Sequence, residues 1–407
     1  MDFLFSNDTN SQVKERLINC FAVHQKPLNN IFQEIRSSKG EKPEQNYLVM
    51  GQRGAGKTIF LYRLKFAIED DHRLNKFIIT IMFGEEQYHI TNLFELWESV
   101  AEQLKGSKAF SGIIKTVQSD KLSNKYIEQK AYQLLESTLK KRDKKIVLFI
   151  ENIDILFDKI GKTGQQRLRE VLTTSTNIRI IGSATTYFEG IIDYSYPFYD
   201  FFKIIRLNEL STEDAVTLLT KMAAQSKEPI KRTQILRQSA TRIEVLRRLT
   251  GGNPRMIAYL YPILMDNVPG SAIEDLYKLL DRFTLLNKSE LDQLSPQQQK
   301  IIDFMARNWD AISVKQLVSG TRMASKHISS VLNMLEKIKV IDRINTNTKN
   351  NLYRIRDRVL NIWYLMRYGK EKDKENLRWL VRFYVAWCGK SGLLEEYYNN
   401  DNDNALV

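Results

Sequence analysis

The segment Gly51–Thr58, which reads GQRGAGKT, restricts the fold of this chain more than any other part of its sequence. It follows a short apolar run at Asn46–Met50 and precedes a helical pattern at Lys57–Ile68. The GxxxxGK[ST] spacing lets a glycine-rich loop wrap closely around an anion, with its main-chain N–H groups pointing inward. A helix that starts directly after the loop adds the positive end of its dipole. We therefore expect a phosphate-binding loop between a buried strand and a helix; the alternative is a glycine-rich turn without a ligand.

The side chains of this loop have separate expected roles at a nucleotide. Lys57 is expected to reach the β- and γ-phosphates, and the Thr58 hydroxyl is expected to ligate Mg²⁺. The pattern therefore predicts ATP or ADP, together with Mg²⁺, as the bound cofactors. The residues expected to contact the nucleotide here are Gly51, Gln52, Arg53, Gly54, Ala55, Gly56, Lys57, Thr58 and Ile59.

Short, fully apolar runs alternate with helical patterns in the first half of the chain. This alternation is typical of a parallel sheet whose two faces are covered by helices. We therefore predict an α/β fold in which residues 45–210 form a P-loop NTPase core with a five-stranded parallel sheet. The expected strands are Asn46–Met50, Phe77–Phe83, Ile146–Ile150, Ile178–Ile181 and Phe202–Leu207. Residues 1–44 are expected to be a helical segment, interrupted at Pro27.

The strand pattern stops near Thr212, and the remaining sequence predicts two further domains. Residues 211–290 are expected to form a helical lid, and residues 291–370 a winged helix-turn-helix domain, because three helical patterns there lead into a β-hairpin. Residues 371–407 are expected to contain a C-terminal helix and a tail. The expected helices are 212–225, 236–249, 254–266, 271–284, 296–308, 313–320, 324–338, 358–368 and 375–388, and the hairpin strands are 340–345 and 352–355.

The strand expected at Ile146–Ile150 ends in the acidic sequence Glu151-Asn152-Ile-Asp154. A carboxylate at this place can hold a metal ion, directly or through water, and we assign that role to Glu151. We take Glu151, Asn152 and Asp154 as the candidate catalytic residues. Asn152 cannot accept a proton from water, so weak hydrolysis is expected. Asp154 could substitute if the loop curls back, or it could cap the next helix.

Two further segments contain candidates for contacts with the nucleotide. Ligands gather at the carboxyl ends of parallel strands, so Ser183, Thr185 or Thr186 could contact the γ-phosphate or its attacking water; a hydroxyl that stabilises a turn is the alternative. Arg255 follows Gly-Gly-Asn-Pro, in which the proline suits the first position of a helix. Arg255 could reach back to the phosphates or form a surface salt bridge.

With these residues in place, the chain resembles the AAA+/STAND class of P-loop ATPases, and most closely the archaeal-type and origin-recognition-like ATPases. The matching segments are GQRGAGKT (51–58), IVLFIENID (146–154), IIGSATT (180–186), LTGGNPR (249–255) and YRIRDRVLNIWYLMRYG (353–369). The resemblance implies a nucleotide between sheet and lid, with Ser183 or Thr185 as sensor 1 and Arg255 as sensor 2. It also implies an ATP/ADP switch that moves the lid and the winged helix.

Two departures from this class concern hydrolysis. Asn152 stands where the usual catalytic acid is found, and the segment 194–202 (YSYPFYDFF) has no arginine that could act as an inter-subunit finger. The resemblance therefore implies nucleotide binding more directly than hydrolysis in a ring of subunits.

The formal net charge of +13 favours an acidic partner such as nucleic acid. Lys and Arg outnumber Asp and Glu about two to one between residues 296 and 380. Cys20 and Cys388 form no metal-binding or CxxC spacing, which fits a reducing compartment. No signal-peptide pattern opens the sequence and no apolar run is long enough to span a bilayer, so we expect a cytoplasmic protein without a membrane partner.

The helix expected at 324–338 would be the recognition helix of the winged-helix domain. Asn and Lys can reach base edges, whereas Ser and Arg suit phosphates, so double-stranded DNA is the expected partner. The candidate DNA contacts are Arg322, Ser325, Lys326, His327, Ser329, Asn333, Arg343 and Lys349. Winged helices of this class also act as protein-docking or autoinhibitory modules, and a basic domain can simply have a solvated face.

Three functions fit these observations. The first is an ATP-driven switch that hydrolyses ATP slowly and uses its winged helix on DNA. The second is a STAND-type signalling switch that self-associates in the ATP state or recruits a protein effector without DNA. The third is a binding-only module that the nucleotide stabilises. We predict the first function, with the second as the alternative.

Overall fold

The computed structural model describes residues 11–368, with gaps at 39–41, 86–88, 105–123, 185–190, 192, 227, 231–232, 234–239, 266–283, 285–287, 289–290, 309, 339 and 345–350. The chain divides into two compact units, Met1–Asn208 and Glu209–Val407. The predicted helix at 375–388, and nearly all of the one at 271–284, lie outside the described residues. Within the described range, no helix combines the length and the apolar character needed to cross a lipid bilayer.

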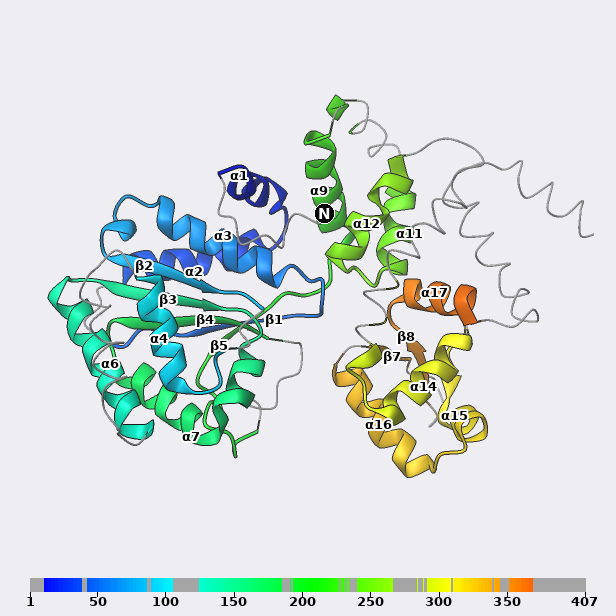
Figure 1. The fold of residues 1–407 in the computed structure, drawn as a ribbon. Coiled ribbons are helices and arrows are strands. Elements are labelled where there is room, and N and C mark those ends of the chain that lie inside the picture. Colours follow the sequence, from blue (N-terminus) through cyan, green and yellow to red (C-terminus); the bar gives the residue numbers. More distant parts are fainter. Residues whose placement is uncertain are drawn as a thin grey trace, which may run out of the picture. The chain divides into compact units, whose positions relative to one another are not determined.

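The first unit contains a five-stranded parallel sheet, as the sequence predicts (Figure 1). Its strands are β1 (Tyr47–Met50), β2 (Ile78–Phe83), β3 (Lys145–Ile150), β4 (Ile178–Ala184) and β5 (Lys203–Arg206). They lie in the order β2-β3-β4-β1-β5. The carboxyl ends of β1, β3 and β4 are therefore neighbours at one edge of the sheet, because all the strands run in the same direction.

Helices cover both faces of this sheet, which explains why its strands are apolar at successive positions. They are α2 (Gln25–Ser37), α3 (Lys57–Asp70), α4 (Leu93–Gln103), α6 (Asn124–Lys141) and α7 (Ile153–Thr174). Tyr47 and Val49 belong to a core shared with α2 and α3, whereas Leu48 and Met50 belong to a core shared with α4, α6 and α7. Figure 1 shows these two sets of helices on opposite faces. Successive side chains of a strand point to opposite faces, so every position of β1 is buried.

A buried ion-pair cluster lies at the opposite edge of the sheet, at the amino ends of the strands. The Arg179 side chain is only 3% exposed, and its Nη2 lies 2.5 Å from Glu44 Oε2. Lys145 Nζ lies 2.9 Å from Glu44 Oε1. Glu44 thus ties the chain entering β1 to the starts of β3 and β4.

The predicted interruption at Pro27 is wrong. The break between the two N-terminal helices, α1 (Ser11–Cys20) and α2, lies at Phe21–His24. His24 has a left-handed backbone (φ 62°), which does not continue a helix. Pro27 lies in the first turn of α2, where its missing N–H has no intrahelical partner to lose.

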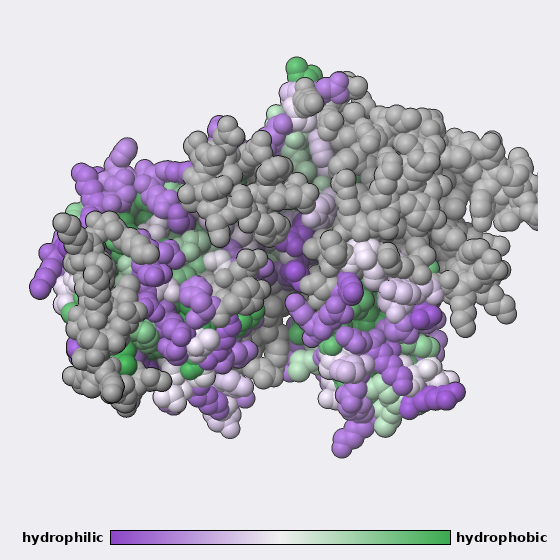
Figure 2. Space-filling view, in the orientation of Figure 1, coloured by the Kyte–Doolittle hydropathy of each residue, from purple (hydrophilic) through white to green (hydrophobic). Residues whose placement is uncertain are grey.

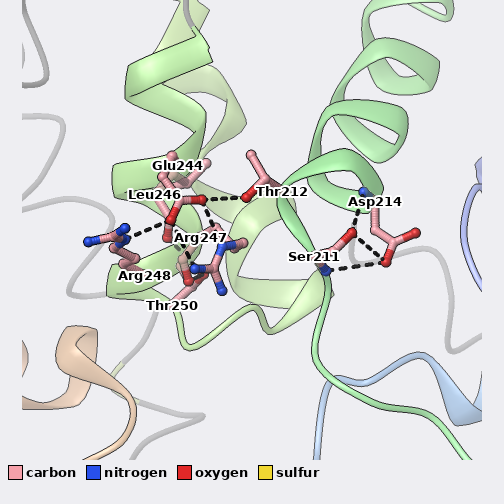
Figure 3. A network of polar contacts seen from close by, with 8 residues as sticks. All are labelled: Ser211, Thr212, Asp214, Glu244, Leu246, Arg247, Arg248 and Thr250. Atoms are coloured by element: carbon pink, nitrogen blue, oxygen red, sulfur yellow. Dashed lines mark hydrogen bonds and ion pairs between the residues drawn. The ribbon is translucent and has the colours of Figure 1, made fainter.

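The second unit begins with helices α9 (Thr212–Ala224), α11 (Ala240–Leu249) and α12 (Pro254–Met265). Figure 3 shows the polar network that joins α9 to α11. The Glu244 carboxylate accepts hydrogen bonds from the Thr212 hydroxyl of α9 and from the guanidinium groups of Arg247 and Arg248. The hydrogen bond from Arg247, followed by those from Thr212 and Arg248, holds the pKa of Glu244 well below its usual range. The network therefore fixes the packing of the first helices after the sheet.

A winged helix follows in the same unit. Its elements are α14 (Pro296–Arg307), β6 (Ile312–Ser313), α15 (Val314–Thr321), α16 (Ser325–Lys337), β7 (Ile341–Ile344), β8 (Leu352–Ile355) and α17 (Arg358–Tyr368). The three strands form an antiparallel sheet in the order β6-β8-β7. The predicted helices and hairpin are confirmed, whereas β6 was not predicted because two residues are too few for a periodic pattern. The boundary near residue 290 between lid and winged helix remains a prediction.

The described surface carries mainly polar side chains. Figure 2 shows hydrophilic residues over much of the drawn face, with hydrophobic residues scattered among them. Among the larger apolar side chains, Tyr194 is the most exposed at 87%, followed by Ile230 at 85%. Single exposed apolar residues of this kind are common on proteins.

Candidate functional site

The loop between β1 and α3 has a compact, closed conformation. Gly54 and Gly56 have left-handed backbones (φ 82° and 93°), which side chains rarely allow. A Cβ atom on Gly51 would lie 3.1 Å from the carbonyl oxygen of Leu207, the residue after β5, which is a tight contact for any side chain. The Ala55 amide donates to the Gln52 carbonyl at 3.1 Å and closes the turn. The glycines of the motif are therefore required by the path of the backbone.

The Lys57 side chain folds back across this loop. Its Nζ atom donates to the carbonyl oxygens of Gly51 at 2.9 Å and of Gln52 at 3.0 Å. These contacts hold the ammonium group at the loop, directly beside the N-terminus of α3. A cation and a helix start at the same place form an arrangement that attracts phosphate groups.

The two predicted metal ligands, Thr58 and Glu151, are brought together. The Thr58 hydroxyl, in the first turn of α3, hydrogen-bonds the Glu151 carboxylate at the end of β3. Glu151 is 7% exposed. Burial, and to a smaller extent the negative charge of Glu85, raises the pKa of Glu151 to about 7, while the Thr58 hydrogen bond and the charge of Lys57 act in the opposite direction. A nearby cation would favour the ionised carboxylate.

Asn152 forms the turn between β3 and α7. It has a left-handed backbone (φ 47°), and its amide donates to the Ser183 hydroxyl at 3.3 Å. Ser183 lies on β4 and is 2% exposed. Ser183 therefore holds the acidic strand end in place; its direct contact with a γ-phosphate remains a prediction. Thr185 and Thr186 lie outside the described residues.

Asp154 lies in the first turn of α7 and faces the same region as Lys57. Burial raises the pKa of Asp154, whereas its own amide, the Ile155 amide and the charge of Lys57 act to lower it. Its Oδ1 atom is buried and has no hydrogen-bond partner in the described part of the chain. One oxygen of this carboxylate is therefore available to a ligand, while the amide contacts agree with a role at the helix start.

The oxygen donors at this edge fit a magnesium ion. Mg²⁺ prefers oxygen ligands and is usually held by one or two carboxylates together with substrate phosphates. The Thr58 hydroxyl, the Glu151 carboxylate and the Oδ1 atom of Asp154 supply such atoms beside the loop. The charge of Lys57 acts on both carboxylates, which places all of these groups in one small region.

Glu85 is a further acidic residue at this edge that the sequence interpretation missed. It follows β2 by two residues, and its charge acts on Glu151. Finding it from the sequence would have required knowing that β2 is the neighbour of β3. The signal was present as a glutamate just beyond an apolar run, but that feature is common.

The Gly-Gly-Asn-Pro turn before Arg255 lies in the second unit. Gly251 and Gly252 have left-handed backbones, and the Gly252 carbonyl accepts a hydrogen bond from the Leu210 amide at 2.9 Å. The Asn253 side chain accepts from the Arg255 amide at 3.0 Å. The turn thus fixes the start of α12. The contact of Arg255 with a nucleotide remains a prediction.

The outer face of α16 carries most of the predicted DNA contacts. Ile328, Val331, Leu332 and Leu335 face the core of the winged helix. The exposed predicted residues are Arg322, Ser325, Lys326, His327, Ser329 and Asn333. Lys349 lies outside the described residues.

Arg343 on β7 binds α16 directly. Its Nη2 donates to Asn333 Oδ1 at 2.8 Å and to Glu336 Oε2 at 2.6 Å, and its guanidinium lies over the Tyr353 ring. These contacts fix the wing against the helix. Asn333 and Arg343 thus have structural partners within the protein, and their roles in binding DNA remain predictions.

No protein-family model matches this sequence, and no curated protein matches it. Solved structures do match. A Walker-type ATPase of Pyrococcus abyssi has a TM-score of 0.56 and 16% identity, over 89% of this chain and 99% of that chain. The Aeropyrum pernix ORC1 protein, solved in complex with DNA, has a TM-score of 0.43 and 13% identity, over 89% and 98%. The Thermotoga maritima RuvB Holliday junction branch migration motor has 0.38 and 14%, over 88% and 95%.

Among these three, only the Pyrococcus protein has a TM-score above 0.5, so the shared fold rests on that structure. The likeness extends over nearly all of that chain, and it agrees with the five-stranded parallel core followed by helices and a winged helix. The predicted fold class and the resemblance to archaeal-type ATPases are confirmed as a similarity of fold. At 16% identity the likeness concerns the fold alone.

Proposed function

We propose that this protein binds Mg²⁺ and ATP at the loop Gly51–Thr58 and hydrolyses the ATP slowly. The observation that carries this proposal is the arrangement of Lys57 across the loop, with Thr58 hydrogen-bonded to the buried Glu151. A cation, a helix start and a hydroxyl–carboxylate pair together match the needs of a nucleoside triphosphate and its metal ion.

The residues of the loop and of the end of β3 have different roles in binding. The main-chain amides at the start of α3 bind the β-phosphate, because the first amides of a helix carry the positive end of its dipole. Lys57 contacts the β- and γ-phosphates. Thr58 and Glu151 hold Mg²⁺, with Asp154 as a further oxygen donor. The ion would neutralise part of the charge that develops on the transferred phosphoryl group.

Slow turnover is expected because the end of β3 supplies no proton acceptor at position 152, so an acceptor has to come from another element of the fold. Asn152 stands where a carboxylate would accept a proton from the attacking water, and an amide cannot do so at neutral pH. Proper placement and electrostatic stabilisation by Lys57 and the metal still favour the reaction. Binding is therefore expected to be strong relative to the rate of hydrolysis.

We further propose that the nucleotide state controls how the second unit acts on double-stranded DNA. Residues 211–290 act as the lid, with Arg255 as the contact to the phosphates, and residues 291–370 act as the DNA-binding domain. The exposed Arg322, directly after α15, and Lys326, in the first turn of α16, support this proposal, because such side chains can contact phosphates in a groove.

A second candidate function is a signalling switch that self-associates or recruits a protein effector in its ATP state. The contact of Arg343 with Asn333 and Glu336 favours it, because a basic and an amide side chain expected to reach DNA bind the protein itself. In that case the winged helix would be a docking module.

The turnover of ATP with and without duplex DNA tests these proposals, with Lys57→Ala as the background control. The first function predicts slow, Mg²⁺-dependent hydrolysis that duplex DNA stimulates and high salt suppresses. A turnover rate that duplex DNA does not change, together with a larger species in ATP than in ADP by size-exclusion chromatography, would favour the signalling switch. A protein that does not bind ATP would reject both functions.

A further inference from the structure

We propose that Glu85, which follows β2, accepts the proton of the attacking water during ATP hydrolysis. Position 152, where a carboxylate would usually do this, holds an asparagine. This inference rests on the proposed ATP-binding function. It concerns a residue that follows β2, whereas Glu151 and Asn152 follow β3.

The sheet brings Glu85 to the nucleotide edge. Strands β2 and β3 pair in parallel with Phe83 opposite Ile150, and the Glu151 amide donates to the Phe83 carbonyl at 2.9 Å. Glu85 follows Phe83 by two residues, which limits the separation of their Cα atoms to about 7 Å. Glu85 and Glu151 therefore end neighbouring strands at the same edge.

The negative charge of Glu85 acts on the carboxylate of Glu151, the proposed metal ligand. After burial, the negative charge of Glu85 is the largest cause that raises the pKa of Glu151. Like charges act on each other in this way only over short distances in a protein. The electrostatic coupling thus agrees with the strand register in placing Glu85 beside the proposed magnesium site.

The other acidic groups at this edge are less suited to the task. Glu151 is buried and hydrogen-bonded to Thr58. Asp154 lies at the start of α7, where it accepts from its own amide and the Ile155 amide. Glu85 is exposed, so water can reach its carboxylate. Among the carboxylates described at this edge, Glu85 is the one that an incoming water molecule can reach directly.

The step conserves atoms and charge. The water oxygen forms a bond to the γ-phosphorus while the bond between that phosphorus and the bridging oxygen breaks, and the electron pair of the broken bond stays on ADP. The water proton passes to the Glu85 carboxylate and then to solvent. The products are ADP, inorganic phosphate and one proton.

The variant Glu85→Gln tests this role, because it keeps the shape of the side chain and removes the proton acceptor. We expect single-turnover hydrolysis to fall at least about 100-fold, the usual contribution of a general base, while the dissociation constant for ATP with Mg²⁺ changes less than about twofold. The melting temperature without nucleotide should stay equal or rise, since the repulsion with Glu151 is removed. Glu170→Gln is the matched control, because Glu170 is exposed near the other end of α7 and should leave the rate unchanged.

The outcomes separate this inference from the proposed function. A wild-type protein that binds ATP but never hydrolyses it would overturn the role of Glu85 and leave nucleotide binding intact. Hydrolysis by Glu85→Gln within about threefold of wild type would also overturn the role. Loss of ATP binding in Glu85→Gln would show that the residue serves binding and not proton transfer. A wild-type protein that binds no ATP would reject the proposed function itself.

Discussion

The Lys57 ammonium group lies 2.9 Å from the carbonyl oxygen of Gly51, at the other end of the same loop. It also donates to the Gln52 carbonyl at 3.0 Å. A half-buried ammonium group needs such partners. It has three N–H donors, so it can also contact phosphate oxygens, which carry more charge than carbonyl oxygens.

Replacement of Lys57 by alanine should therefore remove ATP binding. Charge-assisted hydrogen bonds contribute about 1.5–3 kcal/mol each, so the loss of two of them predicts at least about a 100-fold weaker affinity. Titration with a fluorescent ATP analogue measures the change. Lys76→Ala is the control, because Lys76 is exposed beyond the far end of α3. Equal affinities for the two variants would show that Lys57 does not contact the phosphates.

The ion pair between Glu44 and Arg179 should make the stability of the first unit depend on pH. Burial alone would raise the pKa of Glu44, but the charges of Arg179 and Lys145 and the Ser38 hydrogen bond outweigh it and hold the pKa below its ordinary value of 4.5. The stabilisation is therefore complete above the unfolded-state pKa and is lost as the pH falls through the lower folded-state pKa.

We expect Glu44→Gln to lower the free energy of unfolding by about 3 kcal/mol at pH 7, because Arg179 is left buried without its counter-charge. The difference from wild type should shrink as the pH falls below about 4.5, the unfolded-state value. Chemical denaturation at both pH values measures it. Glu136→Gln, which removes a surface pair with Lys140, should cost less than about 1 kcal/mol. A loss for Glu44→Gln that is the same at pH 7 and pH 4 would contradict the electrostatic explanation.

The two glycines before α12 should differ in their tolerance of alanine. Both have left-handed backbones, but a Cβ atom on Gly252 would lie 2.9 Å from the Leu210 carbonyl oxygen, whereas one on Gly251 would make ordinary contacts with Arg356. Gly251→Ala should cost about 1–2 kcal/mol, from the backbone alone. Gly252→Ala adds a clash with a main-chain atom and should cost about 3 kcal/mol or more. Thermal denaturation of both variants checks this order, and equal losses would mean that the Leu210 contact is absent in solution.

Arg322 and Lys326, changed together to glutamate, should weaken duplex DNA binding at least about tenfold. Each phosphate contact that is lost should reduce the slope of log affinity against log salt by about 0.9. Fluorescence anisotropy with a labelled duplex at several salt concentrations measures both quantities. The control is Lys288→Glu with Lys300→Glu, which changes the net charge equally on exposed residues outside α16. Equal DNA affinities for the two double variants would show that α16 does not face DNA. The affinity for ATP should be unchanged in both double variants.

The sequence predicted those parts of the site that depend on local patterns. The loop Gly51–Thr58 needs glycines at fixed positions for its left-handed turns, and five apolar runs are long enough to be recognised as strands. The metal-binding role proposed for Glu151 follows from its place directly after one of these strands. Local geometry leaves the same signature wherever it occurs, so a single sequence was sufficient here.

Other parts depend on contacts between distant segments. The position of Glu85 beside Glu151 follows from the pairing of β2 with β3, which no local pattern specifies. The contact of Arg343 with Asn333 likewise depends on how the hairpin packs against α16. The break at Phe21–His24 was misplaced because Pro27 is a conspicuous signal, yet a proline in the first helical turn costs little.

A crystal structure of the protein with Mg²⁺ and a non-hydrolysable ATP analogue tests the central claim most directly. We expect the Lys57 ammonium to contact the β- and γ-phosphates, with Thr58 and Glu151 at the metal ion. A nucleotide bound away from this loop, or a Lys57 ammonium without a phosphate contact at saturating analogue, would contradict the account.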